Sequence, residues 1–164
     1  MTYRVVQWCT GNVGRHALAG IHARPDLELV GVWVSSPAKA GQDAGALAGL
    51  GVELEVTATT DADALLALRP DCVVYTAMAD TRVGEALEDL ARFLRAGINV
   101  VSSAPVFLQF PDGVVPAAMS DPIRAAAREG GASMRSSTTR PITSTRSCST
   151  SWVSAARSMT CHCC

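Results

Sequence analysis

The chain has 164 residues, of which 48% are hydrophobic and only 5% aromatic, a balance that favours one α/β domain of ordinary size over an all-β sandwich. The formal net charge of −1 gives no reason to expect a nucleic-acid partner. No apolar run approaches the roughly 20 residues of a membrane span, so no membrane partner is expected either.

The first part of the chain alternates strand-like and helix-like segments. Residues 4–8 are a short apolar run, and residues 13–24 carry apolar side chains at the spacing of one helix face. Residues 27–34 form a nearly continuous apolar run, which is typical of a parallel strand covered on both faces. A glycine-rich segment with one helical turn, 35–51, and a third strand, 52–58, are expected to follow.

The pattern continues through the middle of the chain. Asp61 is expected to cap a helix over residues 62–68, and residues 72–76 are a β-branched fourth strand. Thr81 is expected to cap a long helix that ends at Gly97, where glycine favours a helix stop.

A fifth strand over 98–102 and a helix over 116–128 complete the elements expected from the pattern. Strands that alternate with helices predict βαβ units and right-handed crossovers. We therefore expect an α/β domain over residues 1–134: a Rossmann-type, doubly wound parallel sheet that is incomplete at its C-terminal edge.

The turn between the first strand and the first helix carries the strongest motif. Its residues 9–14, Cys-Thr-Gly-Asn-Val-Gly, occupy the place of a G-x-G-x-x-G dinucleotide fingerprint. In that motif Gly11 allows close approach of a pyrophosphate and Gly14 allows the helix to pack on the sheet, while the helix N-terminus attracts the phosphates. Cys9 replaces the first glycine, which is tolerated if its φ stays negative. Phosphate binding is assigned to Thr10, Gly11, Asn12, Val13 and Gly14.

The end of the second strand discriminates between the two nicotinamide dinucleotides. Enzymes specific for NAD place an Asp or Glu there to bind the ribose 2′-hydroxyl, whereas this strand ends in Ser35 and Ser36, with Lys39 shortly after. Two hydroxyls and an ammonium suit a 2′-phosphate. We therefore favour NADP(H) as the cofactor, with NAD(H) possible; alternatively, these three residues form an ordinary polar loop.

Four segments resemble a known family. Residues 5–18, 41–49, 71–76 and 97–103 are similar to the N-terminal part of dihydrodipicolinate-reductase-like proteins, in particular the branch that contains 2,4-diaminopentanoate dehydrogenase. The resemblance covers about residues 3–134. It implies an NAD(P)-dependent oxidoreductase that transfers hydride at a C–N centre of a small amine or imine substrate.

The resemblance also implies which loops border the nicotinamide ring. These follow the fourth and fifth strands, and their residues are Thr76, Ala77, Met78, Ser102, Ser103, Ala104 and Pro105. The family's acid/base residues lie in a C-terminal substrate domain, and no segment here matches its His/Lys-bearing part. Catalytic residues therefore stay unassigned, with His16 and His22 expected at the surface. The alternative is a non-catalytic dinucleotide-binding fragment.

Residues 135–164 differ in composition from the rest. They hold eight Ser, six Thr, four Arg and four Cys without an acidic residue, whereas all 15 acidic residues precede Arg135. This composition predicts a disordered tail, with the substrate domain absent.

Three explanations of this tail remain open: a shifted reading frame, which we favour; a zinc site of Cys148, Cys161, His162, Cys163 and Cys164, whose spacing is poor; and a basic tail that binds nucleic acid. No metal is assigned. A homo-oligomer is expected only with the substrate domain, and the lack of a signal peptide predicts a cytoplasmic protein.

Overall fold

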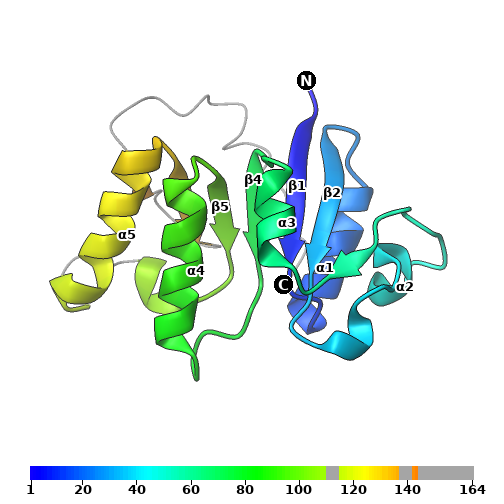
Figure 1. Cartoon of the computed structure of the whole chain (residues 1–164), viewed down its shortest axis with the longest axis horizontal. Helices are drawn as coiled ribbons and strands as arrows, with labels where there is room; N and C mark the ends of the chain where they lie inside the picture. The colour runs from blue at the N-terminus through cyan, green and yellow to red at the C-terminus, as the bar shows by residue number, and fades with distance from the viewer. Residues whose placement is uncertain (110–114, 137–141, 144–164) are drawn as a thin grey trace.

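The computed structural model describes residues 1–109, 115–136 and 142–143 of the chain. Within them one sheet has the strand order β3-β2-β1-β4-β5-β6-β7, with helices on both of its faces (Figure 1). The strands are β1 (Tyr3–Trp8), β2 (Leu27–Trp33), β3 (Ala58–Thr59), β4 (Cys72–Tyr75), β5 (Asn99–Ser102), β6 (Ser133–Ser136) and β7 (Ile142–Thr143). The strands from β1 to β6 pair in parallel, as predicted, and β7 pairs antiparallel with β6.

The helices connect these strands in chain order. They are α1 (Asn12–His22), η1 (Pro37–Lys39), α2 (Ala44–Ala48), α3 (Ala62–Ala67), α4 (Val83–Arg95), η2 (Val106–Gln109) and α5 (Ala117–Gly130). From β1 the chain builds outward through β2 to β3, then returns to add β4, β5 and β6 on the other side of β1. The strand order therefore reverses between β1 and β4, and the carboxyl ends of these two strands border the crevice in which open α/β sheets bind ligands.

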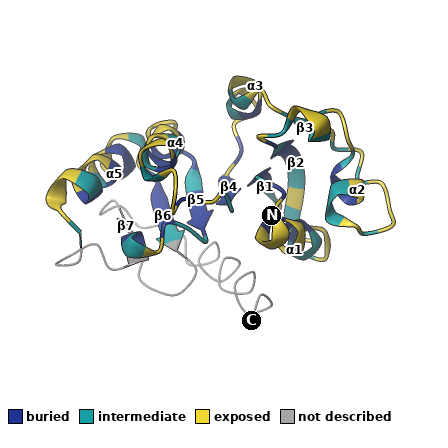
Figure 2. Cartoon of the chain, turned by 90° about the horizontal axis from the view of Figure 1, so that it is seen from below, coloured by how far each residue is buried: buried dark blue, intermediate teal, exposed yellow. Residues whose placement is uncertain are grey.

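Both faces of the sheet are buried. Figure 2 shows α3, α4 and α5 along one face, and α1 on the other. Alternate residues of β1 serve the two faces: Val6 and Trp8 pack in the large cluster with α4 and α5, and Val5 packs with Ile21 of α1. This two-sided burial explains why β1 and β2 are apolar runs in the sequence rather than alternating ones.

The third strand is much shorter than expected. The sequence predicted a strand over 52–58, but β3 covers only Ala58–Thr59. The cause is Asp43, whose carboxylate accepts hydrogen bonds from the backbone N–H groups of Gly45, Leu54 and Val56 at 2.7–3.3 Å. These bonds hold the segment before β3 as a loop against the start of α2. The backbone of this segment is therefore not free to pair with β2.

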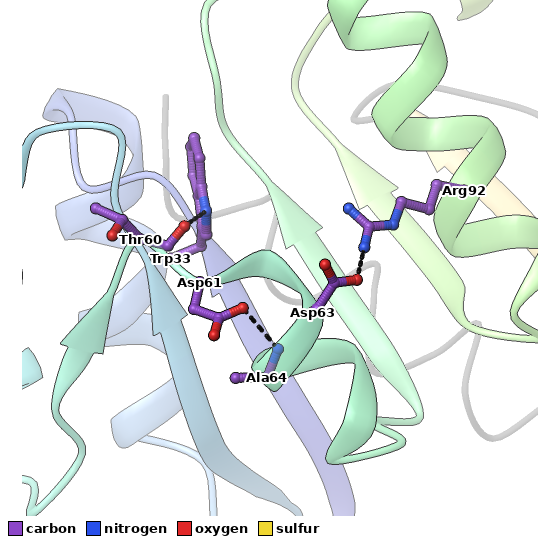
Figure 3. Close-up of polar contacts among 6 residues, drawn as sticks. All are labelled: Trp33, Thr60, Asp61, Asp63, Ala64 and Arg92. Carbon is purple, nitrogen blue, oxygen red and sulfur yellow. Dashed lines mark hydrogen bonds and ion pairs between the residues drawn. The ribbon is translucent and has the colours of Figure 1, made fainter.

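One of the predicted N-terminal helix caps is present in the structure, and the other is not. Asp61 caps α3 as expected, with its carboxylate accepting from Ala64 N–H at 2.9 Å, and an ion pair of Asp63 with Arg92 joins α3 to α4 (Figure 3). The expected cap by Thr81 is wrong. Helix α4 begins one residue later than assumed, so Arg82 occupies the capping position and makes no side-chain cap bond. Gly97 follows the end of α4 with a φ of 78°, as its role as a helix stop requires.

The C-terminal edge of the domain extends beyond the boundary predicted at residue 134. Strand β6 continues to Ser136, and β7 adds a further pair of residues to the sheet. The sequence predicted a disordered tail from residue 135, but these residues belong to the sheet. The remaining tail, including the four cysteines and His162 considered as zinc ligands, lies outside the described residues.

Candidate functional site

The β1–α1 turn presents free backbone donors at the crevice. Gly11 is the N-cap of α1, and neither a capping side chain nor an acidic residue occupies the first turn of this helix. No atom lies within 4 Å of the position that a Cβ on Gly11 would take. The first N–H groups of α1 are therefore available to an anion, and the helix dipole favours negative charge at this point.

Gly14 packs beneath the turn, as the motif predicted. A Cβ at this position would overlap the carbonyl oxygen of Cys9 and would lie 2.9 Å from Thr76 Oγ1, closer than the 3.0 Å that real Cβ atoms respect. The absence of a side chain at Gly14 thus allows α1 to approach the ends of β1 and β4. Gly14 is buried and does not line the pocket.

Cys9 adopts a conformation that the sequence did not predict. Its φ is +71°, whereas a negative φ was the expected condition for a cysteine at the first glycine position. This left-handed conformation costs an L-residue with a Cβ about 1–2 kcal/mol relative to glycine. The turn therefore keeps the geometry of the glycine motif, and the strain falls on Cys9.

A pocket of about 490 Å³ opens at the carboxyl ends of β1, β2 and β4. Its lining includes every residue predicted for the cofactor site except Gly14, Ser102 and Pro105: Thr10, Gly11, Asn12, Val13, Ser35, Ser36, Lys39, Thr76, Ala77, Met78, Ser103 and Ala104. Strands far apart in the sequence contribute to it because the strand order reverses at β1 and β4.

Ser102 lies behind this pocket. Its side chain is buried, accepts a hydrogen bond from Ala104 N–H at 3.1 Å and donates to the Ala104 carbonyl oxygen. The hydroxyl therefore organises the loop after β5 and leaves the adjacent Ser103 at the pocket wall. The pocket also includes three residues that the sequence analysis did not assign to the site, Val34, Ala79 and Asp80.

Lys39 is held against the phosphate-binding turn. Its Nζ donates to the carbonyl oxygen of Thr10 at 3.1 Å and to the Thr10 hydroxyl oxygen at 3.3 Å. The ammonium therefore lies between the loop after β2 and the turn, while Ser35 and Ser36 lie in the segment between β2 and η1. This position brings one positive charge close to where phosphate groups would bind.

The thiol of Cys9 carries no charge near neutral pH. Burial, together with the negative charge of Asp89, raises the pKa of Cys9 to about 11, and the positive charges of Arg82 and Lys39 only partly oppose this. Desolvation likewise raises the pKa values of Tyr75 and Asp89, which share a hydrogen bond of 3.3 Å. A neutral thiol in the turn does not repel an anion, but it is also a poor nucleophile.

Other side chains with catalytic potential are sparse in the described part of the chain. His16 and His22 are exposed on α1, as expected. Among the described residues no group of three or more His, Cys, Asp or Glu side chains is arranged to hold a metal ion. None of the described helices has the length and hydrophobicity to cross a membrane. The pocket thus provides anion-binding groups, while an acid/base pair is not evident among the described residues.

The sequence of residues 5–109 matches the model of the family "Dihydrodipicolinate reductase, N-terminus". The chain belongs to this family. The match covers β1 through η2, which includes every element that contributes to the pocket, and it confirms the resemblance seen in the sequence.

Two curated relatives agree with the assignment to this family. An amine dehydrogenase of Streptomyces virginiae is 46% identical over 136 residues, which are 83% of this chain and 38% of that protein. The 4-hydroxy-tetrahydrodipicolinate reductase of Trichormus variabilis is 42% identical over 62 residues, 38% of this chain and 22% of that protein. The chain therefore spans well under half the length of these relatives.

Solved structures place the fold among dehydrogenases. The amine dehydrogenase from Mycobacterium smegmatis superposes with a TM-score of 0.64 at 27% identity, over 82% of this chain and 38% of that one. Dihydrodipicolinate reductase from Paenisporosarcina sp. TG-14 gives a TM-score of 0.60 at 14% identity, over 83% and 47% of the two chains, and shows the shared fold alone. The predicted Rossmann-type fold is thus confirmed.

Proposed function

We propose that this family member binds a nicotinamide dinucleotide in the pocket at the ends of β1, β2 and β4. The observation that carries the proposal is the β1–α1 turn, where Gly11 leaves the start of α1 open and Gly14 brings the helix onto the sheet. This arrangement suits a pyrophosphate because unpaired N–H groups and the helix dipole converge on it. GenD2, a structural relative, was solved in complex with NAD, and a biliverdin reductase with NADP+.

We infer a preference for NADP(H) over NAD(H). Ser35 and Ser36 line the pocket at the end of β2, without a carboxylate at that strand end to repel a 2′-phosphate. Lys39 adds a positive charge nearby, although its hydrogen bonds to Thr10 direct it toward the pyrophosphate side. The serine hydroxyls are therefore the groups best placed to bind the 2′-phosphate, with Lys39 contributing through its field.

The proposed reaction is hydride transfer at a C–N centre of a small amine or imine. The bound dinucleotide would supply or accept the hydride; the chain's own Thr76, Ala77, Met78 and Ser103 would border the ring on the β4 and β5 side. The names of the amine dehydrogenase and reductase relatives support this substrate class. Residues 1–134 would serve as the dinucleotide domain of the oxidoreductase, and the acid/base groups would lie outside the matched part.

The alternative is a dinucleotide-binding fragment without catalysis. It is favoured by the strain at Cys9, whose φ of +71° is costly for a residue other than glycine. Both functions require cofactor binding, so turnover of an amine substrate distinguishes them.

Calorimetric titration of the purified chain with NADPH and NADH at fixed salt tests the shared part of these proposals. We expect micromolar binding that is tighter for NADPH. Equal affinities would remove the inferred preference, and failure of both ligands to bind would refute the cofactor site.

A further inference from the structure

A buried amide lies beneath the phosphate-binding turn. Gln7 occupies an interior position of β1 between the apolar residues Val6 and Trp8, and its side chain is fully buried, with an exposed fraction of 0%. Its Oε1 has no hydrogen-bond partner among the described residues. An amide that is only partly satisfied costs stability compared with an apolar side chain of the same size. The hydrogen bonds that Gln7 Nε2 donates must therefore explain why an amide occupies this buried position.

That donor end reaches the turn and the next strand. Gln7 Nε2 lies 2.8 Å from the carbonyl oxygen of Cys9 and 2.7 Å from Thr76 Oγ1. The Thr76 hydroxyl in turn lies 2.9 Å from the carbonyl oxygen of Trp8 and 3.2 Å from that of Cys9. The two N–H groups of the amide can donate to the Cys9 carbonyl oxygen and to Thr76 Oγ1, while the Thr76 O–H donates to the Trp8 carbonyl oxygen. If the amide were rotated by half a turn, Gln7 Oε1 would face the Cys9 carbonyl oxygen, and the two oxygens would repel each other.

These contacts bear on the strained residue of the turn. Because Gln7 is fully buried, the carbonyl group that it binds points into the domain, and Gly14 packs against the same oxygen from α1. An anion site requires this direction, since a carbonyl oxygen facing the pocket would repel a pyrophosphate. A glycine would adopt the left-handed conformation at little cost, but Cys9 adopts it at +71° only with external support.

We propose that Gln7, together with the hydroxyl of Thr76, is a positioning residue for the phosphate-binding turn. The pair holds the Cys9 carbonyl group inside the domain and thereby stabilises the conformation in which the N–H groups at the start of α1 face the ligand. Thr76, expected from the sequence to border the nicotinamide ring, acts on the pyrophosphate through the turn. This inference rests on the proposed function, because the ligand of the turn is the dinucleotide.

A double-mutant cycle of Gln7→Met and Cys9→Gly separates positioning from general packing. Methionine keeps the size of the side chain and removes the donor, while glycine at position 9 needs no support. With Cys9 present we expect Gln7→Met to weaken NADPH binding in calorimetry by about tenfold or more, the effect of one lost hydrogen bond. With glycine at position 9 we expect a loss of about threefold or less. Equal losses in both backgrounds, or no loss in either, would overturn the proposal.

Thr76 provides the matched control. Because Thr76 also lines the pocket, its variants are compared in the ligand-free protein: Thr76→Ser keeps the hydroxyl and should shift the midpoint of urea unfolding less than Thr76→Val, which keeps the shape but removes the donor. If Gln7→Met fails to fold, Thr76→Val takes its place in the cycle with Cys9→Gly and is judged by the same criterion. Equal midpoints of the two ligand-free Thr76 variants would contradict the role of its hydroxyl.

The cycle can also be measured without a ligand, which separates this inference from the proposed function. If the unmodified chain binds neither NADPH nor NADH, the cofactor proposal fails. The midpoints of urea unfolding of the four ligand-free proteins then decide whether Gln7 supports Cys9. A smaller shift by Gln7→Met in the glycine background supports the positioning role, and identical shifts in both backgrounds refute it.

Discussion

The packing of α1 on the carbonyl group of Cys9 can be tested by one substitution made at two positions of the same helix. Gly14→Ala places a methyl group onto the Cys9 carbonyl oxygen and 2.9 Å from Thr76 Oγ1, so backbone has to move. Gly20→Ala, six residues further along α1, meets no atom within 4 Å. The pair therefore isolates the close approach from the effect of alanine on helix formation.

The two variants should shift the free energy of unfolding in opposite directions. Alanine in place of glycine stabilises a helix by up to about 1 kcal/mol, and this gain should appear in full only for Gly20→Ala. Overpacking against a rigid backbone group costs about 1–3 kcal/mol, which exceeds the helix gain at Gly14. We expect the variants to differ by about 1–3 kcal/mol, the cost of overpacking, with Gly14→Ala the less stable.

Urea unfolding followed by circular dichroism measures this difference, provided that the slopes of the transitions agree. The same proteins can be titrated with NADPH, for which only Gly14→Ala should lose affinity because the turn is displaced. A Gly14→Ala protein as stable as Gly20→Ala would show that α1 does not pack on the Cys9 carbonyl group. Reduced stability with unchanged affinity would show that the turn tolerates the displacement.

Three further predictions concern a cap, a thiol and the cofactor preference. Asp61→Ala should lower the free energy of unfolding in urea by about 1 kcal/mol through loss of the α3 cap, and Asp61→Asn, which keeps the acceptor, should cost less; equal losses would contradict the capping role. With its pKa raised to about 11, Cys9 should be alkylated by iodoacetamide at pH 8 about a hundredfold more slowly than a model peptide thiol, as followed by peptide mass spectrometry. Alkylation at the rate of the model peptide would refute the raised pKa of the Cys9 thiol. Because burial raises the folded-state pKa of this thiol, its contribution to stability is complete below about pH 9 and is lost as the pH rises toward 11. Ser36→Asp should weaken NADPH binding at least about tenfold through repulsion of the 2′-phosphate and leave NADH binding nearly unchanged, and a parallel loss for both would argue against the inferred position of the phosphate.

Several local features followed directly from the sequence. The apolar runs of β1, β2, β4 and β5 are long enough to identify parallel strands buried on both faces. The glycine spacing of the turn after β1 is visible within a few residues of sequence, and the carboxylate of Asp61 caps α3 through Ala64, three residues later. Such interactions leave a signal in a single sequence because spacing alone determines whether the groups meet.

Features that depend on contacts between distant segments were missed. The strand expected over 52–58 is mostly a loop because Asp43, more than ten residues earlier, binds its N–H groups. The positive φ of Cys9 was not predicted either; the carbonyl oxygen of this residue accepts a hydrogen bond from Gln7 Nε2 and lies against Gly14 of α1. Gln7 carried one signal that was overlooked: a polar residue within an otherwise apolar strand needs a buried partner.

The sequence by itself determined the Rossmann-type domain, its alternation of strands and helices, and the turn proposed to bind phosphate, since each depends on local periodicity and glycine spacing. Only the tertiary structure decided which side chains meet at the pocket. In the folded chain Ser102 lies outside the pocket lining, Lys39 donates to Thr10, and Gln7 lies beneath Cys9. These outcomes depend on how β1, β2, β4 and β5 lie side by side in the sheet, and residues that are 29 or 69 positions apart in the chain meet only once the sheet has formed.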